Sequence, residues 1–416
     1  MSALIEEVAA RKILDSRGEP TIEVDVTTVD GFGSASAPSG ASTGKAEAIA
    51  FPEGGVDEAV KKVEELIAPE VIGLYADEQE EIDTILHELD GTDSFRNIGG
   101  NTAYAVSLAV ADAAADSYGL PLFQYLGGSL ASVLPTPLGN VVGGGKHATG
   151  KATDIQEFLV LPLGATSFLA AVEANAAIHR RLKALLREVD ATFTGGRGDE
   201  GAWAPNVSND QALEAVTKAC KQVSEELGLR CKAGLDLAAS SLWDPEKKSY
   251  VYARDGLSRD KGEQIDYILD LIEKYRLAYV EDPFHEDDFT SFKELTSKSR
   301  GCLICGDDLF ATNVKRLRQG IKSHAGNAII IKMNQVGTLT DTWETTRLAK
   351  ENGYIPVVSH RSGETSAFHI AHLAVAFDVP IIKAGVVGGE RITKLNELIR
   401  IEESLGDKAR MAKLGI

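Results

Sequence analysis

The stretch AYVED, residues 278–282, is an apolar run that ends in two carboxylates. Short apolar runs of this kind indicate buried strands, and a charged last residue stands where such a strand meets solvent. Five more runs repeat the pattern, namely AGLDL (233–237), LICGDD (303–308), AIIIKMN (328–334), IPVVSH (355–360) and PIIKAG (380–385). The charged or polar residues near the ends of the six runs are Asp236, Glu281, Asp307, Lys332, His360 and Lys383.

The spacing of these runs indicates how they connect. The last five end residues follow one another at steps of 26, 25, 28 and 23 residues, which suits one strand, one helix and two loops per unit. Helical patterns, with apolar residues three and four apart, cover residues 168–189, 210–227, 261–275, 339–352 and 394–405. This alternation predicts parallel strands with helical crossovers, closed into a β/α (TIM-type) barrel whose polar strand ends meet at one mouth.

The residues before the barrel predict a smaller domain. RKILD and TIEVDVTTV flank the turn-like SRGEP, as in a β-hairpin, and the small residues at positions 34–48 indicate a loop. Helical patterns follow at residues 56–67, 78–89 and 101–118. We therefore expect an α/β protein with an N-terminal α+β capping domain over residues 1–125 and a C-terminal barrel carrying the active site over residues 126–416.

The composition is that of an ordinary globular protein, with 44% apolar and 25% charged residues. No segment has the length and purity of a membrane span, and the N-terminal sequence lacks the basic start and apolar run of a secretory signal. Four cysteines are too few for a disulfide framework, and the strand-like run around Cys302 and Cys305 favours two buried thiols over a zinc or redox site. We expect a cytoplasmic protein.

The net charge of −19 opposes binding to nucleic acids and to anionic membranes, since both depend on patches of Lys and Arg. Overall charge does not exclude a small anionic substrate held in a locally positive pocket. The expected partner is therefore a small molecule.

The segment GGGKHATGKAT, residues 143–153, has the spacing of a nucleotide-binding P-loop, with Gly145, Gly150 and Lys151 in place. However, Ala152 stands where a Ser or Thr should hold magnesium, and the following DIQEFLVLPL indicates a strand where a P-loop requires a helix. The pattern excludes nucleotide binding. We interpret this segment as a lid over the barrel mouth.

A single Asp at a strand end is usually a turn residue or a helix cap. Six polar ends in succession, three carboxylates followed by Lys, His and Lys, are hard to explain by capping alone. Three carboxylates on neighbouring strand ends form an all-oxygen site for Mg²⁺, although a structural network of ion pairs is the alternative. Near a metal and Arg361, the pKa of Lys332 and of Lys383 should fall, which would free an amine to act as a base. The combination suits proton abstraction beside a carboxylate, with the metal carrying the charge of the enolate.

Nine segments then identify a family. They are DSRGEPT (15–21), PSGASTG (38–44), QEF (156–158), GDEGAWAP (198–205), EDPF (281–284), GDDL (306–309), KMNQVGT (332–338), SHRSGET (359–365) and RIEESLG (400–406). Through this ordered set, which runs over nearly the whole chain, the sequence closely resembles the enolase (phosphopyruvate hydratase) family. The resemblance implies a lyase of glycolysis that dehydrates 2-phosphoglycerate to phosphoenolpyruvate, and the reverse reaction.

The resemblance also implies roles for individual residues. Lys332 matches the base that removes the C2 proton, and Glu200 matches the acid that helps the C3 hydroxyl leave. Glu157 matches the carboxylate that assists Glu200, and Gln156 matches its neighbour facing the substrate. Asp236, Glu281 and Asp307 match the ligands of a tightly held Mg²⁺, and Ser42 matches a ligand of a second Mg²⁺. Arg361 and Ser362 match the phosphate contacts, and Lys383 matches a contact of the substrate carboxylate. His147 and His360 match residues that close around the reacting end. The family further implies a homodimer or a higher homo-oligomer.

Several neighbours of the matched residues depart from the family pattern. Glu19 and Gly143 each stand where the family has Asn, and Lys146 stands where it has a small residue, with about one extra residue before QEF. Ala202 and Trp203 replace Gly-Phe, and Ser366, Ala367 and His372 replace acidic residues. AGVV (384–387) replaces TGAP.

These departures leave alternatives open. The chain could be a paralogue acting on another phosphorylated hydroxy acid, or an inactive relative that only binds a phosphorylated ligand. A dehydratase or racemase of unphosphorylated acid sugars is disfavoured by the SGAST loop and by Arg361 and Ser362, all of which are directed at a phosphate.

Overall fold

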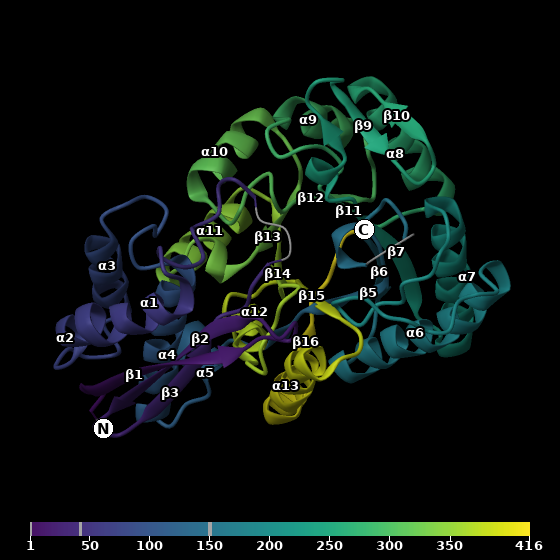
Figure 1. Cartoon of the computed structure of the whole chain (residues 1–416). Coiled ribbons are helices and arrows are strands. Elements are labelled where there is room, and N and C mark those ends of the chain that lie inside the picture. Colours follow the sequence, from purple (N-terminus) through teal and green to yellow (C-terminus); the bar gives the residue numbers. More distant parts are fainter. Residues whose placement is uncertain (1, 41–43, 149–151) are drawn as a thin grey trace.

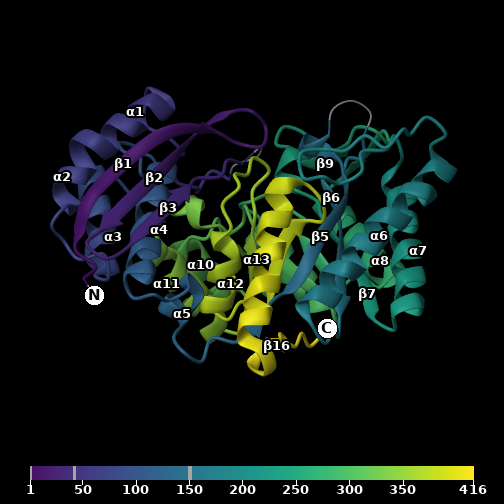
Figure 2. The same ribbon diagram turned by 90° about the horizontal axis from the view of Figure 1, so that it is seen from below.

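The computed structural model describes residues 2–40, 44–148 and 152–416. Figures 1 and 2 show a smaller N-terminal lobe, coloured purple to blue, beside a larger barrel coloured teal to yellow. Within the described residues, no helix is long and apolar enough to cross a lipid bilayer.

The N-terminal lobe begins with a three-stranded antiparallel sheet in the order β1 (Ile5–Leu14), β2 (Pro20–Thr28), β3 (Phe32–Ser36). The predicted hairpin is confirmed, because β1 and β2 pair along their whole length. The start of the predicted loop was assigned wrongly, since Ser34 pairs with Asp25 inside β3. Strand β3 also packs closely against the residues around Ala109, because a Cβ added at Gly33 would lie 2.2 Å from the carbonyl oxygen of Ala109.

The helices of this lobe pack on the sheet and on the barrel. They are α1 (Gly55–Lys62), a π-helical turn (Val63–Ile67), α2 (Ala68–Val71), α3 (Gln79–Asp90), α4 (Gly100–Ser117) and α5 (Leu122–Gly127). Helix α4 is buried along almost its whole length because β2 and β3 contact it, as do α11 (Leu339–Glu351) and the short turn Met333–Gln335 of the barrel. This all-round burial explains its Ala-rich sequence.

Eight strands close the barrel in the order β11-β12-β13-β14-β15-β5-β6-β7. Their bounds are β5 Thr136–Gly143, β6 Glu157–Leu163, β7 Arg230–Asp236, β11 Tyr279–Glu281, β12 Leu303–Gly306, β13 Ala328–Ile331, β14 Ile355–Ser359 and β15 Ile381–Gly385. The expectation of parallel strands is wrong at β6, which pairs antiparallel with both β5 and β7. The segment between β5 and β6 contains no crossover α-helix in its described part, so β6 returns beside β5 in the opposite direction.

Two helices, α6 (Phe168–Val189) and α7 (Asn209–Leu227), then follow in succession before β7, and one main helix follows each later strand. These are α8 (Lys261–Tyr275), which follows the small sheet β8–β10, then α9 (Phe289–Lys298), α10 (Val314–Ser323), α11 (Leu339–Glu351), α12 (His369–Ala376) and α13 (Gly389–Leu405). The small strands are β8 (Trp243–Asp244), β9 (Ser249–Tyr252), β10 (Leu257–Arg259), β4 (Val133–Leu134) and β16 (Arg410–Met411). Most of the helices predicted from periodicity end within two residues of their predicted bounds, but α13 begins five residues before the predicted start at Lys394.

Candidate active site

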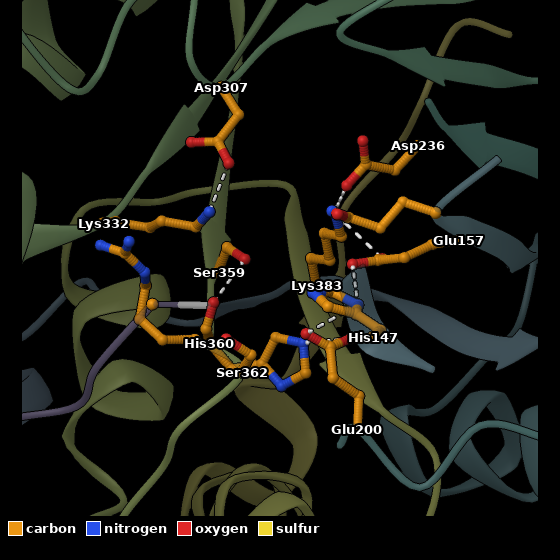
Figure 3. Close-up of a pocket in the computed structure, with 13 residues that line it drawn as sticks. His147, Glu157, Glu200, Asp236, Asp307, Lys332, Ser359, His360, Ser362 and Lys383 are labelled. Atoms are coloured by element: carbon orange, nitrogen blue, oxygen red, sulfur yellow. Dashed lines mark hydrogen bonds and ion pairs between the residues drawn. The ribbon is translucent and has the colours of Figure 1, made fainter. Parts of the chain in front are cut away.

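The carboxyl ends of the parallel barrel strands and the amino end of β6 surround one polar pocket (Figure 3). Its lining residues are Gly40, His147, Gln156, Glu157, Glu200, Asp236, Asp307, Lys332, Ser359, His360, Arg361, Ser362 and Lys383. The pocket thus brings together the predicted site residues other than Glu281 and Ser42. Glu281 contacts the pocket residue Lys383, whereas Ser42 lies outside the described residues. Gly40 and Ser359 also line the pocket and were not predicted.

Three buried carboxylates surround the ammonium group of Lys383 on strand β15. Its Nζ lies 2.9 Å from Asp236 Oδ2, 2.8 Å from Glu281 Oε1 and 3.1 Å from Glu157 Oε2. The register of the barrel produces this cluster, since Asp236 pairs with both Glu281 and Glu157 on the adjacent strands. Burial, followed by the charge of Asp236, raises the pKa of Glu281 to about 8. The three carboxyl groups are thus crowded around one ammonium group, which favours the uptake of a further positive charge, either a proton or a cation.

Asp307, which follows β12, lies with Lys332 on the other side of the pocket (Figure 3). Its carboxylate accepts hydrogen bonds from Lys332 Nζ and, at 2.9 Å, from Gln335 Nε2. The backbone here is held by Asp282, whose carboxylate accepts from the amide of Asp307 at 3.0 Å. Of the three predicted metal ligands, the structure thus joins Asp236 and Glu281 through Lys383 and pairs Asp307 with Lys332.

The neighbours of the two lysines act on their pKa values in opposite directions. Burial and the charges of Arg361 and Lys383 lower the pKa of Lys332, whereas Asp307 and Glu281 raise it, and the net pKa is raised. Burial also disfavours the charge on Lys383, yet Asp236, Glu157 and Glu281 raise its pKa well above the usual value. The carboxylate partners therefore favour the ammonium form of both side chains, and the lowering expected beside a bound metal stays a prediction.

Glu200 and Glu157 form a second buried group with two histidines. Glu200 Oε2 lies 3.2 Å from His360 Nε2, and His147 Nδ1 lies 3.4 Å from Glu157 Oε1 and 3.8 Å from Glu200 Oε1. Sequence reasoning missed Asn140 on β5, whose Nδ2 donates to Glu200 Oε2 at 2.9 Å. No local pattern distinguishes this Asn from any other strand residue.

The surroundings shift the pKa values of Glu157 and Glu200 in opposite directions. Burial and the charge of Glu200 raise the pKa of Glu157 well above its usual range. Burial alone would also raise the pKa of Glu200, but His360 and His147 hold it well below its usual range. Burial lowers the pKa of His360 to about 4. These opposite shifts favour Glu157 over Glu200 as the holder of a single proton shared by the two carboxyl groups.

Comparison with known proteins agrees with this site. The family model described as the enolase N-terminal domain matches residues 5–126, and the one described as the enolase C-terminal TIM barrel domain matches residues 131–414. The chain belongs to the enolase family. It is 59% identical over 406 residues to a protein named enolase from Methanosphaera stadtmanae, covering 97% of this chain and 98% of the relative.

Two further enolases have similar coverage. The enolase of Methanothermobacter thermautotrophicus is 56% identical over 415 residues, covering 100% of both chains, and that of Archaeoglobus fulgidus is 50% identical over 411 residues, covering 99% and 100%. The family relationship thus includes both the N-terminal lobe and the barrel.

The Trp that departs from the enolase pattern supports the loop that carries Glu200. Trp203 Nε1 donates to the carbonyl oxygen of His179 at 2.8 Å, and the two rings stack with their centroids 4.4 Å apart. The ring of His179 also contacts the loop of Glu200, because His179 Nε2 lies 3.1 Å from the carbonyl oxygen of Gly201. At Gly201, φ is 76° and an added Cβ would meet the carbonyl oxygen of Val387 at 2.2 Å, so only glycine fits.

The side chain of Arg361 is held by a carboxylate that sequence reasoning also missed. Arg361 Nη1 and Nη2 each lie 3.0 Å from Glu47 Oε2, and Nη1 donates to Asn334 Oδ1 at 2.9 Å. Both members of the pair are buried. The loop of Arg361 and Ser362 is further fixed by Arg391 of α13, which donates to the carbonyl oxygen of Ser362 at 2.6 Å. Arg361 and Ser362, which the family predicts to contact the phosphate, are therefore both tied to neighbouring residues by hydrogen bonds.

Proposed function

We propose that this chain catalyses the reversible dehydration of 2-phosphoglycerate to phosphoenolpyruvate and water, as a lyase of the phosphopyruvate hydratase type in glycolysis. The observation that carries the proposal is the placement of Lys332 and the Glu157–Glu200 pair in one pocket (Figure 3). A β-elimination of this kind needs a base at C2 and a proton donor at the C3 hydroxyl. Full-length similarity to three enolases favours this reaction over a changed substrate or an inactive protein.

The donor set fits Mg²⁺. Asp236, Glu281 and Asp307 offer only oxygen ligands, and the crowding of carboxyl groups around Lys383 is what a hard dication would relieve. We propose that these three residues hold one Mg²⁺ and that Ser42, with the substrate phosphate, holds a second. When bound, the cations supply Lewis-acid stabilisation of the negative charge that develops on the substrate carboxylate.

Lys332 has the position of the base. To accept the C2 proton its ammonium group must first lose a proton, and its contact with Asp307 opposes this loss. The positive charges of Arg361 and Lys383 favour the neutral amine. We propose that Lys332 takes the proton once its contact with Asp307 is loosened, and that Lys383 contacts the substrate carboxylate.

The Glu157–Glu200 pair has the position of the acid. The opposite pKa shifts favour the shared proton on Glu157, and Glu200 Oε2 lies 3.2 Å from His360 Nε2. We propose that the pair delivers this one proton to the departing C3 hydroxyl, with Glu200 next to the substrate. His147, Gln156 and His360 enclose the reacting end, and Arg361 with Ser362 contacts the phosphate.

The direct test is ultraviolet detection of phosphoenolpyruvate formed from 2-phosphoglycerate, with and without Mg²⁺, beside a panel of other phosphorylated hydroxy acids. We expect Mg²⁺-dependent formation with 2-phosphoglycerate as the preferred substrate. Binding of 2-phosphoglycerate without turnover would indicate an inactive relative, and faster turnover of another acid would indicate a paralogue.

We also propose the organisation around this activity. The lobes divide at about residue 125, since α5 ends at Gly127 and the barrel strands begin at Thr136. Family membership supports a homodimer or higher homo-oligomer that acts in the cytoplasm on a small-molecule substrate. Light scattering of the purified chain tests the oligomeric state.

A further inference from the structure

Tyr279 and Glu281 are two residues apart on strand β11, so their side chains point to the same face of the strand. The phenol of Tyr279 donates to Glu281 Oε2 at 2.6 Å, a short distance typical of a hydroxyl bonded to a carboxylate. The other oxygen, Oε1, faces Lys383 Nζ at 2.8 Å. The two oxygens of Glu281 therefore have different partners. Oε2 accepts from Tyr279, which lies beneath the pocket, and Oε1 accepts from Lys383, which lines it.

The apolar surroundings of Tyr279 indicate that the role of its hydroxyl is the hydrogen bond to the carboxylate of Glu281. Its side chain is fully buried in an apolar layer of the barrel that includes Leu159, Leu161 and Ile330. A Phe would fill such a layer equally well, and a buried hydroxyl is costly without a hydrogen-bond partner.

The neighbouring strand leaves room for the ring. Gly234 pairs with Tyr279 across strands β7 and β11, and a Cβ added at Gly234 would lie 3.0 Å from Tyr279 Cβ. This packing places the phenol hydroxyl as a hydrogen-bond donor against Glu281.

We propose that Tyr279 is a positioning residue for the divalent cation, holding Glu281 Oε2 so that Glu281 presents Oε1 alone beside Asp236. This inference rests on the proposed Mg²⁺ site. A carboxylate that binds through one oxygen occupies a single corner of the octahedron that Mg²⁺ requires. Partners of metal ligands fix ligand orientation in this way, and their removal costs metal affinity.

The test measures metal binding by the full-length protein without substrate. Mn²⁺ is titrated into wild type and Tyr279→Phe, and free Mn²⁺ is followed by electron paramagnetic resonance. We expect the Kd of Tyr279→Phe to rise by about 10- to 100-fold. The matched control is Tyr252→Phe, because Tyr252 is also fully buried and its hydroxyl donates to a side chain, Gln264 Oε1, at 2.9 Å. Both variants should lose thermal stability, but Tyr252→Phe should bind Mn²⁺ like wild type.

The outcomes separate this inference from the proposed function. Equal Kd values for wild type and Tyr279→Phe would overturn the role of Tyr279 while leaving the metal site in place. A Glu281→Gln variant that binds Mn²⁺ like wild type would instead overturn the metal assignment itself, and the role of Tyr279 with it.

A second measurement does not depend on the folding of Tyr279→Phe. The infrared difference spectrum of wild type with and without Mg²⁺ should show a carboxylate with widely separated stretching bands, typical of binding through one oxygen, and Glu281→Gln should lack it. Narrowly separated bands from Glu281, typical of binding through both oxygens, would overturn the inference.

Discussion

The support of Glu200 by Asn140 gives a prediction whose size follows from the structure. Asn140→Ala removes the Nδ2 donor that lies 2.9 Å from Glu200 Oε2, while His360 remains in place. Asn140 is fully buried, so no bulk water replaces the lost donor. The perturbation therefore acts on one oxygen of the proposed acid.

A hydrogen bond to a charged group is worth about 1.5–3 kcal/mol. Because one pKa unit corresponds to about 1.4 kcal/mol, the loss should raise the pKa of Glu200 by about 1 to 2 units. The pair is active when it carries one proton, so protonation of Glu200 on top of Glu157 removes activity at low pH. The acid limb of the kcat/KM profile should shift to higher pH by the same 1 to 2 units.

The assay is kcat/KM for phosphoenolpyruvate formation as a function of pH. Asn175→Ala is the matched control, because Asn175 is also buried and its Nδ2 donates at 3.1 Å to a backbone carbonyl, that of Pro137. It should lose stability without a shift of the acid limb. The same profile for both variants would refute the argument that Asn140 acts through Glu200.

Three further predictions concern the base, the metal and the fold. Lys332→Ala should abolish hydrogen–deuterium exchange at C2 of 2-phosphoglycerate, followed by NMR, with Mn²⁺ binding largely intact; full exchange would remove Lys332 as the base. Asp307→Asn should raise the Mg²⁺ concentration needed for half-maximal activity, and an unchanged requirement would remove Asp307 from the ligands. Burial lowers the pKa of His179 to about 4, so the folded protein should lose stability as the pH falls from about 6.5 towards 4, where only the unfolded chain binds the proton. Urea unfolding of His179→Gln should show a weaker pH dependence over this range, and an unchanged dependence would contradict the assignment.

The strand ends could be predicted because their signal is local. Each run is apolar until it reaches the mouth, and the step between runs gives the connection, so the sequence places Asp236 and His360 at the end of the strands. The direction of β6 was predicted wrongly because an apolar run carries no direction. The signal that was available is the Gly-rich segment 144–156, which has no helical periodicity and is poorly suited to a parallel crossover.

Contacts between distant segments could not be predicted in the same way. Glu47 and Arg361 are 314 residues apart, and nothing near either residue indicates the other. The contact between Lys332 and Asp307 is a further example, because the approach of Asp307 depends on the backbone held by Asp282. Side-chain pairing at the mouth therefore required the structure.

The departures from the enolase pattern lie outside the set of residues that line the pocket. Gly143 stands where the family has Asn and Ala202 where it has Gly, and a Cβ added at Gly143 would lie 3.6 Å from the Cβ of Ala202. One position has become smaller and the position facing it larger, so the two changes compensate each other in volume. Trp203 is likewise accommodated by stacking on His179. Within the described residues, no substituted position lines the pocket. The residues that line the pocket determine which substrate binds. Because the substitutions lie outside this lining, they favour the reaction of the family over a change of substrate.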